Sequence, residues 1–433
     1  MISVKWFRMK KTWLGLILLF LLQTSLAETM DLQVVAEQAI IDVVNPGGLG
    51  AIVAMDMRGQ VIAQADQGNN NLEYPLAFNH RSIPGAVFRP ITVLAALFNG
   101  VLDPEEQISD VGAFVQYNVE SPLFCWLSLA EIQHHHNLNY IDAIFHDCYF
   151  FCYSLGARLG VDGERLSNFA DTIGLTSTTG NETKSFVGNQ QVLFDTAISL
   201  DEQETEIPLE VHSALIEYLS TISHHSLQEL ETCALNLMEM AVHNDTGFAY
   251  QNWESGIMQE LRGKLLYEAN KSEIDSIIEI LSIIKWNGTN SIEVSNGQSR
   301  LIQCTPISIA RVYTMIANGG FLYIDDSDQV VSDLSQSIGQ YLPHIKEAIH
   351  GNRNRYTSLD DAQLTVSWIT QNADNICSVL QLIEPSAEQT GEWYVCIAPY
   401  DAPEIVVVAY TEDCATGSAI SLVDQFLKAY FAE

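Results

Sequence analysis

Basic residues are scarce in this sequence. Acidic residues outnumber Lys and Arg 54 to 20 over 433 residues, and the formal charge is -34 at pH 7. Affinity for phosphate backbones comes from Lys and Arg side chains that displace counterions, so the composition argues against a nucleic-acid partner. No Asp-x-Asp-x-Asp-Gly calcium loop occurs either. We interpret the acidic excess as a solvated surface around a sizeable core, since 47% of the residues are hydrophobic.

Closely spaced cysteine pairs are also lacking. The nearest two, Cys148 and Cys152, stand four residues apart without a second close pair, so no zinc-ribbon spacing is present. Connectivity cannot be read from the spacing, and we expect buried free thiols. The eight cysteines lie at positions 125, 148, 152, 233, 304, 377, 396 and 414.

Long apolar runs are limited to the N-terminus. Four basic residues precede the run Trp13 to Leu22, and Ser25-Leu26-Ala27 follows as a small-residue cleavage site. Because a spanning helix needs roughly 20 apolar residues, we interpret residues 1–27 as a signal peptide, with a retained short membrane anchor as the alternative. The prediction is an exported protein at the periplasmic or extracellular face of the cytoplasmic membrane. It would contact the membrane only if this segment is retained.

The order of apolar patterns predicts an α+β fold. Strands at both ends of the chain and helices between them indicate an antiparallel sheet flanked by helices and assembled from the two ends. The predicted hairpin covers 50–56 and 60–66, the predicted helices cover 90–99, 138–159 and 422–431, and the later strands cover 375–382, 392–398 and 404–411.

Residues 184–292 differ from the rest. Asp and Glu become dense there, and Ser226-Leu-Gln-Glu229 and Ser272-Glu-Ile-Asp275 are patterns typical of helix starts before apolar-periodic runs. We predict an acidic, all-helical insertion over 184–292 within one domain that covers 28–433.

Three segments resemble one family. Gly50-Ala-Ile-Val-Ala-Met-Asp56 is similar to an opening strand, and Ile83-Pro-Gly-Ala-Val-Phe-Arg-Pro-Ile-Thr92 is similar to a Pro-Gly-Ser-x-Phe-Lys-Pro segment. Thr305-Pro-Ile-Ser-Ile-Ala-Arg311 is close to a Thr-Pro-x-x-x-Ala-Arg helix. Together they resemble the transpeptidase domain that class B penicillin-binding proteins share with serine beta-lactamases. The resemblance covers about 50–183 and 293–431, and it implies a beta-lactamase/transpeptidase-like fold.

The resemblance also implies a serine nucleophile with a lysine one helical turn later. Here those two positions are Ala86 and Arg89. Alanine has no oxygen that could attack a carbonyl, and an arginine with a pKa above about 12 cannot accept a proton at neutral pH. Because Asp147 falls in the facing motif, we expect a salt bridge between Arg89 and Asp147 across the former cleft, with their charged groups within about 4 Å of each other.

The two remaining motifs also depart from the family. Asp147-Cys148-Tyr149 stands where the resemblance implies Ser-x-Asn, and the Lys-Thr-Gly motif should fall near Cys377 to Leu382, where Ser378 follows Cys377. We treat Gln389-Thr390-Gly391 as a coincidence. No catalytic residue is therefore intact, and the sequence predicts neither cofactor nor metal.

We predict a binding or scaffolding pseudoenzyme whose partners are cell-wall synthesis proteins or peptidoglycan stem peptides. One alternative is an active transpeptidase or carboxypeptidase that uses another nucleophile, such as Ser82, or Ser282 of the string Ser282-Ile-Ile-Lys285. Another is a sensor that holds wall peptides or beta-lactams reversibly. His134-His135-His136 with His146 and Asp147 could gather a metal, but their irregular spacing argues against it.

Overall fold

The computed structural model describes twelve stretches of the chain: residues 31–68, 75–116, 122–131, 134–179, 182–189, 207–243, 250–284, 286, 288–324, 329–351, 367–381 and 391–432. The proposed signal peptide lies outside them. None of the helices in these stretches is long and apolar enough to cross a membrane.

A five-stranded antiparallel sheet is the centre of the fold, in the order β2-β1-β11-β10-β9. The first hairpin pairs directly with a C-terminal strand, with Val53 opposite Val408. The two ends of the chain therefore build one sheet, as predicted. The strands are β1 (Leu49–Asp56), β2 (Val61–Gln67), β9 (Cys377–Gln381), β10 (Gly391–Ala398) and β11 (Ile405–Glu412).

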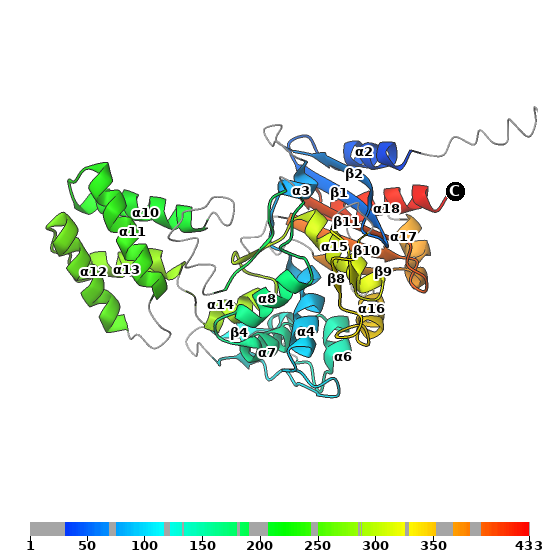
Figure 1. Cartoon of the computed structure of the whole chain (residues 1–433), viewed down its shortest axis with the longest axis horizontal. Coiled ribbons are helices and arrows are strands. Elements are labelled where there is room, and N and C mark those ends of the chain that lie inside the picture. The colour runs from blue at the N-terminus through cyan, green and yellow to red at the C-terminus, as the bar shows by residue number, and fades with distance from the viewer. Residues whose placement is uncertain are drawn as a thin grey trace, which may run out of the picture.

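Helices cover both faces of this sheet (Figure 1). Helices α2 (Leu32–Val43) and α18 (Ser418–Tyr430) pack on one face, and α15 (Pro306–Ala317) packs on the other. Burial on two faces explains why β10 and β11 are apolar along their length instead of alternating. The predicted α+β fold with a helix-flanked antiparallel sheet is confirmed.

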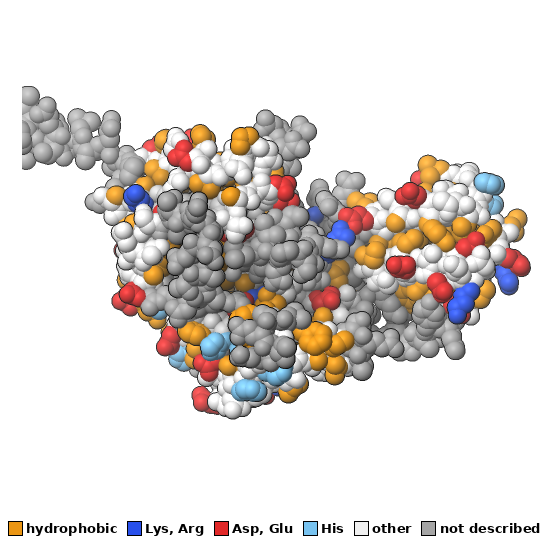
Figure 2. Space-filling model, turned by 180° about the vertical axis from the view of Figure 1, so that it is seen from behind, with side chains coloured by type: hydrophobic (Ala, Val, Ile, Leu, Met, Phe, Trp, Pro, Cys, Tyr) orange, Lys and Arg blue, Asp and Glu red, His pale blue; other side chains and the backbone are white. Residues whose placement is uncertain are grey.

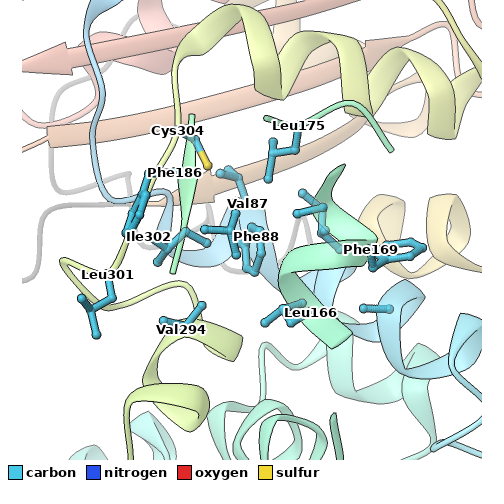
Figure 3. Packing of buried hydrophobic residues seen from close by; sticks show 14 of the residues in the cluster. Val87, Phe88, Leu166, Phe169, Leu175, Phe186, Val294, Leu301, Ile302 and Cys304 are labelled. Carbon is cyan, nitrogen blue, oxygen red and sulfur yellow. The ribbon is translucent and has the colours of Figure 1, made fainter. Parts of the chain in front are cut away.

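The segment that carries Ala86 and Arg89 is anchored in the larger core. It forms the short 3-10 helix η1 (Gly85–Phe88), which continues directly into α4 (Arg89–Phe98). Figure 3 shows Val87 and Phe88 surrounded by side chains from other segments, among them Phe186 and Ile302. Both Val87 and Phe88 are fully buried, so packing fixes the start of α4.

Four helices stand together at one side of the sheet-containing body (Figure 1). They lie within the predicted insertion, but this range is not all-helical. Phe186 and Val187 form strand β5, which pairs with β6 (Ile302–Gln303). A two-residue strand made with a partner more than a hundred residues away leaves no periodic pattern to read. The four helices are α10 (Ile207–Ile222), α11 (Leu227–His243), α12 (Tyr250–Leu265) and α13 (Lys271–Ser282).

The two predicted helix starts in this range differ in outcome. Helix α11 begins directly after Ser226, whose backbone N–H and hydroxyl both donate to Glu229. The start at Ser272 is wrong by two residues, because Asn270 caps α13 in a reciprocal capping box with Glu273. Acidic side chains are scattered over the face shown in Figure 2, over both the body and the bundle, as expected for a solvated surface.

The remaining elements of the described residues are helices and four two-residue strands, of which β3 pairs with β4 and β7 pairs with β8 in two separate small sheets. They are α3 (Leu76–Asn79), β3 (Ala113–Phe114), β4 (Leu123–Phe124), α5 (Trp126–Glu131), α6 (Tyr140–Phe145), α7 (Tyr149–Leu159), α8 (Glu164–Thr172), α14 (Gly288–Ser295), β7 (Phe321–Leu322), β8 (Ser332–Asp333), α16 (Leu342–Gly351), α17 (Ser367–Gln371) and η3 (Ala373–Asn375).

Glu392 is a buried acid between β10 and the N-terminus of α18. Burial raises its pKa to about 7, although the N–H of Gly417 donates to its carboxylate at 2.9 Å. Folding therefore favours the protonated form of Glu392. The free energy that this protonation contributes to stability is fully present below the ordinary pKa of 4.5 and is lost as the pH rises through about 7.

We expect Glu392→Gln to remove this pH dependence. The amide is neutral at every pH and keeps an oxygen for Gly417, so the variant should be more stable than the wild type at pH 8, by up to about 3 kcal/mol. Urea unfolding at pH 5 and pH 8 measures the difference. Glu404→Gln, at an exposed position, controls for the change in net charge. Equal slopes with pH in wild type and Glu392→Gln would contradict the assignment.

Candidate functional site

Arg89 is the centre of the candidate site. Its side chain is 3% exposed, and its Nη1 forms an ion pair with Oδ1 of Asp147. Its Nε donates to Oδ1 of Asn296 at 3.0 Å, and its guanidinium lies 4.2 Å from the centre of the Tyr149 ring. Burial alone would lower the pKa of Arg89, but the charge of Asp147 outweighs it and the pKa is raised. The predicted salt bridge is confirmed, and Arg89 is a permanent cation.

A turn between two helices brings Asp147 to Arg89. The sequence predicts one helix over 138–159, and this prediction is wrong: α6 ends at Phe145 and α7 begins at Tyr149. Asp147 has a φ of 53°, a left-handed conformation that Asp tolerates better than most residues. The indole Nε1 of Trp126 donates to the carbonyl oxygen of Asp147 at 3.0 Å, which holds this turn in place.

Ala86 lies at the crowded start of α4. It is 5% exposed, and the N–H of the preceding Gly85 donates to the carbonyl oxygen of Gly297 at 2.8 Å. Gly297 has a φ of 75°, and a Cβ there would lie 2.3 Å from the oxygen of Gly85, so only glycine fits. The backbone contact between Gly85 and Gly297 thus fixes the position of Ala86. The methyl group of Ala86 offers no nucleophile.

Asn296 is a site residue that the sequence analysis missed. It follows α14, and while its Oδ1 accepts from Arg89, its Nδ2 donates to Oε1 of Gln298 at 2.6 Å. It is 1% exposed. The Asn296-Gly297 dipeptide is a turn signal, but nothing local shows that the amide meets a residue 207 positions earlier.

The other predicted positions are spread around this pair. Cys148 caps the start of α7 and Tyr149 stacks on Arg89. Ser378 is buried on β9, the strand that packs beside η1 and pairs Ser378 with Cys396. A cavity of about 610 Å³ opens elsewhere, beside β2, and is lined by residues that include Gln64, Glu182 and Arg311. This cavity does not include Arg89 or Asp147 among its lining residues, and the ion pair itself is buried.

Within the described residues, neither alternative serine has a suitable base beside its hydroxyl. Ser82 forms an isolated β-bridge with Cys304, and its hydroxyl bonds to Tyr410. Burial raises the pKa of Tyr410 well above its ordinary value, so this phenol is a poor proton acceptor. Ser282 donates its hydroxyl to the carbonyl oxygen of Glu279 in its own helix, at 2.6 Å. Its proposed partner, Lys285, lies outside the described residues.

Four side chains that could bind a metal ion lie together next to the turn that carries Asp147. The Asp110, Cys125, His135 and Cys148 ligand atoms all lie within 4.8 Å of one another, and all four residues are buried. Cys125 Sγ lies 3.9 Å from Cys148 Sγ and 3.6 Å from His135 Nδ1. Tetrahedral zinc with bonds of about 2.3 Å to sulfur and about 2.0 Å to nitrogen spaces these pairs about 3.8 and about 3.5 Å apart. These two spacings therefore match those of a zinc site.

The electrostatics of this cluster favour ionisation of the Cys125 thiol over that of Cys148. Hydrogen bonds from Cys148 and His135 lower the pKa of the Cys125 thiol, although burial opposes the shift. The same contact with Cys125, together with burial, raises the pKa of Cys148. Burial raises the pKa of Asp110, whose carboxylate accepts from the N–H of Gly112 at 2.6 Å. A bound cation would stabilise the second thiolate and the carboxylate.

The sequence interpretation named no metal site, and the histidines that it weighed do not assemble one among themselves. Only His135 enters the cluster. His134 Nδ1 lies 3.0 Å from the Ser128 hydroxyl, His136 is exposed, and Asp147 is paired with Arg89. Asp110 was missed because no motif connects it with residues 15 to 38 positions later. All eight cysteines are free thiols, as expected, and all except Cys414 are buried.

Comparisons with known proteins place this arrangement. Residues 50–201 match the model of the penicillin binding protein transpeptidase domain. The structure of Pseudomonas aeruginosa PBP2 is 16% identical with a TM-score of 0.55, over 93% of this chain and 77% of that one. The transpeptidase domain of Burkholderia pseudomallei penicillin-binding protein 3 is 12% identical with a TM-score of 0.52, over 93% of both chains. For Helicobacter pylori PBP2 the values are 15% and 0.56, over 93% and 63%. No curated protein matches the chain.

Proposed function

Because this chain has the fold of penicillin-binding protein transpeptidase domains and matches their family model over residues 50–201, we propose that it is a non-catalytic relative of those enzymes. The observation that supports the proposal is the buried Arg89–Asp147 ion pair beside Ala86. Acyl transfer needs a nucleophile and a group that accepts its proton. At these positions the chain offers a methyl group and a guanidinium that its carboxylate partner keeps protonated.

The ion pair also argues against recruitment of a substitute base. Nη1 of Arg89 faces Asp147 and its Nε donates to Asn296, and burial keeps water away from both contacts. Loss of the nucleophile in serine enzymes of the triad type costs a factor of about 10⁶ in turnover, and further losses add little because the groups act as a unit. We therefore assign this site a structural role: it holds α4, α7 and the turn after α14 together.

We propose a binding or scaffolding role at the cell envelope, outside the cytoplasm. One solved structure of similar fold is a complex between PBP2 and MreC from Helicobacter pylori, of whose PBP2 this chain covers 62%. By analogy, the partners of this protein would be cell-wall synthesis proteins, with peptidoglycan stem peptides as the alternative ligand. The bundle α10–α13 stands apart from the sheet and is the part most free to make such contacts (Figure 1).

A fluorescent penicillin tests the loss of catalysis. We expect no covalent adduct on the full chain by gel fluorescence or intact-protein mass spectrometry, under conditions in which an active transpeptidase is fully acylated. An adduct that maps to Ser82 or another hydroxyl would show an enzyme and overturn the proposal. Saturable binding without an adduct, measured by equilibrium dialysis, would instead favour a reversible sensor.

A second proposal follows from the cluster behind Asp147: Asp110, Cys125, His135 and Cys148 hold a zinc ion that stabilises the fold. Two sulfurs, one imidazole and one carboxylate form a donor set that suits zinc, and four protein ligands leave no open position for catalysis. Cys148 adjoins Asp147, and Cys125 adjoins Trp126, which binds the Asp147 carbonyl. The ion would therefore fix the turn that carries Asp147 to Arg89.

A further inference from the structure

We propose that oxidation joins Cys125 and Cys148 in a disulfide bond and thereby releases the metal ion from the Asp110–Cys125–His135–Cys148 cluster. This inference rests on the zinc site proposed above and adds a redox response to it. Exchange of this kind requires two thiolates among the ligands and within reach of each other. A cluster with a single thiolate could not respond in this way.

The distance between the two sulfurs allows the bond. Cys125 Sγ and Cys148 Sγ lie 3.9 Å apart, and a disulfide requires about 2.0 Å, so the atoms must approach by about 2 Å. Both residues lie outside the regular part of a helix. Cys125 directly precedes α5, and Cys148 is the N-cap of α7 with an extended backbone. Neither residue needs to break an internal helical turn to move.

The cluster is buried, but the chain comes to the protein surface directly before Cys125. All four ligands are buried, yet Phe124, which directly precedes Cys125, is 39% exposed. The strand β4 that leads to Cys125 is only two residues long, Leu123–Phe124, and among the described residues its one partner strand is the equally short β3. Local opening of so small a sheet costs less than global unfolding, so a small oxidant can reach Cys125 without unfolding the domain.

The reaction balances with an oxidant that carries a disulfide. The Cys125 thiolate attacks one sulfur of the oxidant, forms a mixed disulfide and expels the first thiolate. Cys148 then attacks the Cys125 sulfur and expels the second thiolate. The two protein sulfurs lose two electrons, the oxidant gains them, and the metal ion leaves because only Asp110 and His135 remain. Such oxidants are typical of the oxidising compartments outside the cytoplasm.

The bond replaces the link that the ion supplied. In both states, the segment before α5 is tied to the turn before α7. Trp126 continues to donate to the Asp147 carbonyl, and Asp147 continues to face Arg89. We therefore expect the oxidised, metal-free protein to stay folded, whereas the reduced, metal-free protein lacks both links.

The test treats the zinc-loaded full chain with hydroxyethyl disulfide. Released zinc is followed with a chromogenic chelator, and peptide mass spectrometry identifies the linked cysteines. We expect release of the bound zinc together with a Cys125–Cys148 peptide that lacks two hydrogens, both reversed by dithiothreitol and added zinc. Cys125→Asp keeps an anionic ligand, so this variant should retain zinc through the same treatment. Cys233→Ala, which removes a buried thiol of α11 outside the cluster, should behave as the wild type.

The outcomes separate this inference from the zinc site itself. Wild-type protein that binds zinc and retains it under the oxidant would overturn the redox response and leave the zinc site standing. Release of zinc without a Cys125–Cys148 link, or equal release from Cys125→Asp, would also overturn it. A reduced wild-type chain that binds no zinc at all would overturn both.

Discussion

Asp147→Ala is expected to lower the free energy of unfolding by about 3 to 5 kcal/mol, because the substitution leaves the buried Arg89 charge without its carboxylate. Both side chains are almost fully buried, at 3% and 7% exposure. Water cannot replace the lost partner there. Urea or guanidinium unfolding of the wild type and of Asp147→Ala measures the difference in the free energy of unfolding.

A second ion pair in the same domain provides a matched control. Arg158 and Glu106 form a bidentate pair of 2.7 and 2.8 Å, but their side chains are 35% and 34% exposed. Glu106→Ala should cost only about 0 to 1 kcal/mol, because water solvates the freed guanidinium. The double variant Arg89→Met, Asp147→Leu should recover most of the stability lost in Asp147→Ala. A loss below about 1 kcal/mol in Asp147→Ala would contradict a buried, structural ion pair.

His135→Ala is expected to abolish zinc binding and to remove the stabilisation that zinc provides. A ligand that binds only the folded state at a free concentration of 100 times its dissociation constant adds about 2.7 kcal/mol. Elemental analysis gives the metal content, and thermal unfolding with zinc or with a chelator gives the stability. The wild type should respond to the chelator and His135→Ala should not.

The adjacent residue supplies the control for this prediction. His136→Ala removes an exposed imidazole from the same run of histidines, so it should bind zinc and respond to the chelator as the wild type does. The chelator step also separates the metal from the packing of the imidazole, since packing is lost in the variant under both conditions. Wild-type protein with the same stability in zinc and in chelator would contradict a structural metal.

Local sequence patterns predicted the five strands of the central sheet. The hairpin of β1 and β2, the C-terminal strands and the last helix were all predictable, because strands β10 and β11 are short, nearly continuous apolar runs and the last helix repeats its apolar residues with the helical period. The helix over 138–159 was wrong because neither glycine nor proline stands between Phe145 and Tyr149 to signal a break, while the break depends on the left-handed backbone of Asp147. Contacts with Trp126 and Arg89 stabilise that break, and both come from other segments.

The candidate site divides in the same way. Side-chain identity alone determined that Ala86 offers no hydroxyl and that Arg89 carries a permanent charge, because these are properties of single residues. The motif positions also led to the predicted Arg89–Asp147 ion pair, but only the tertiary structure decided that Arg89 meets Asn296 across 207 positions. It alone brought Asp110 and His135 to the two cysteines, since long-range packing leaves no spacing in the chain from which such a meeting could be read.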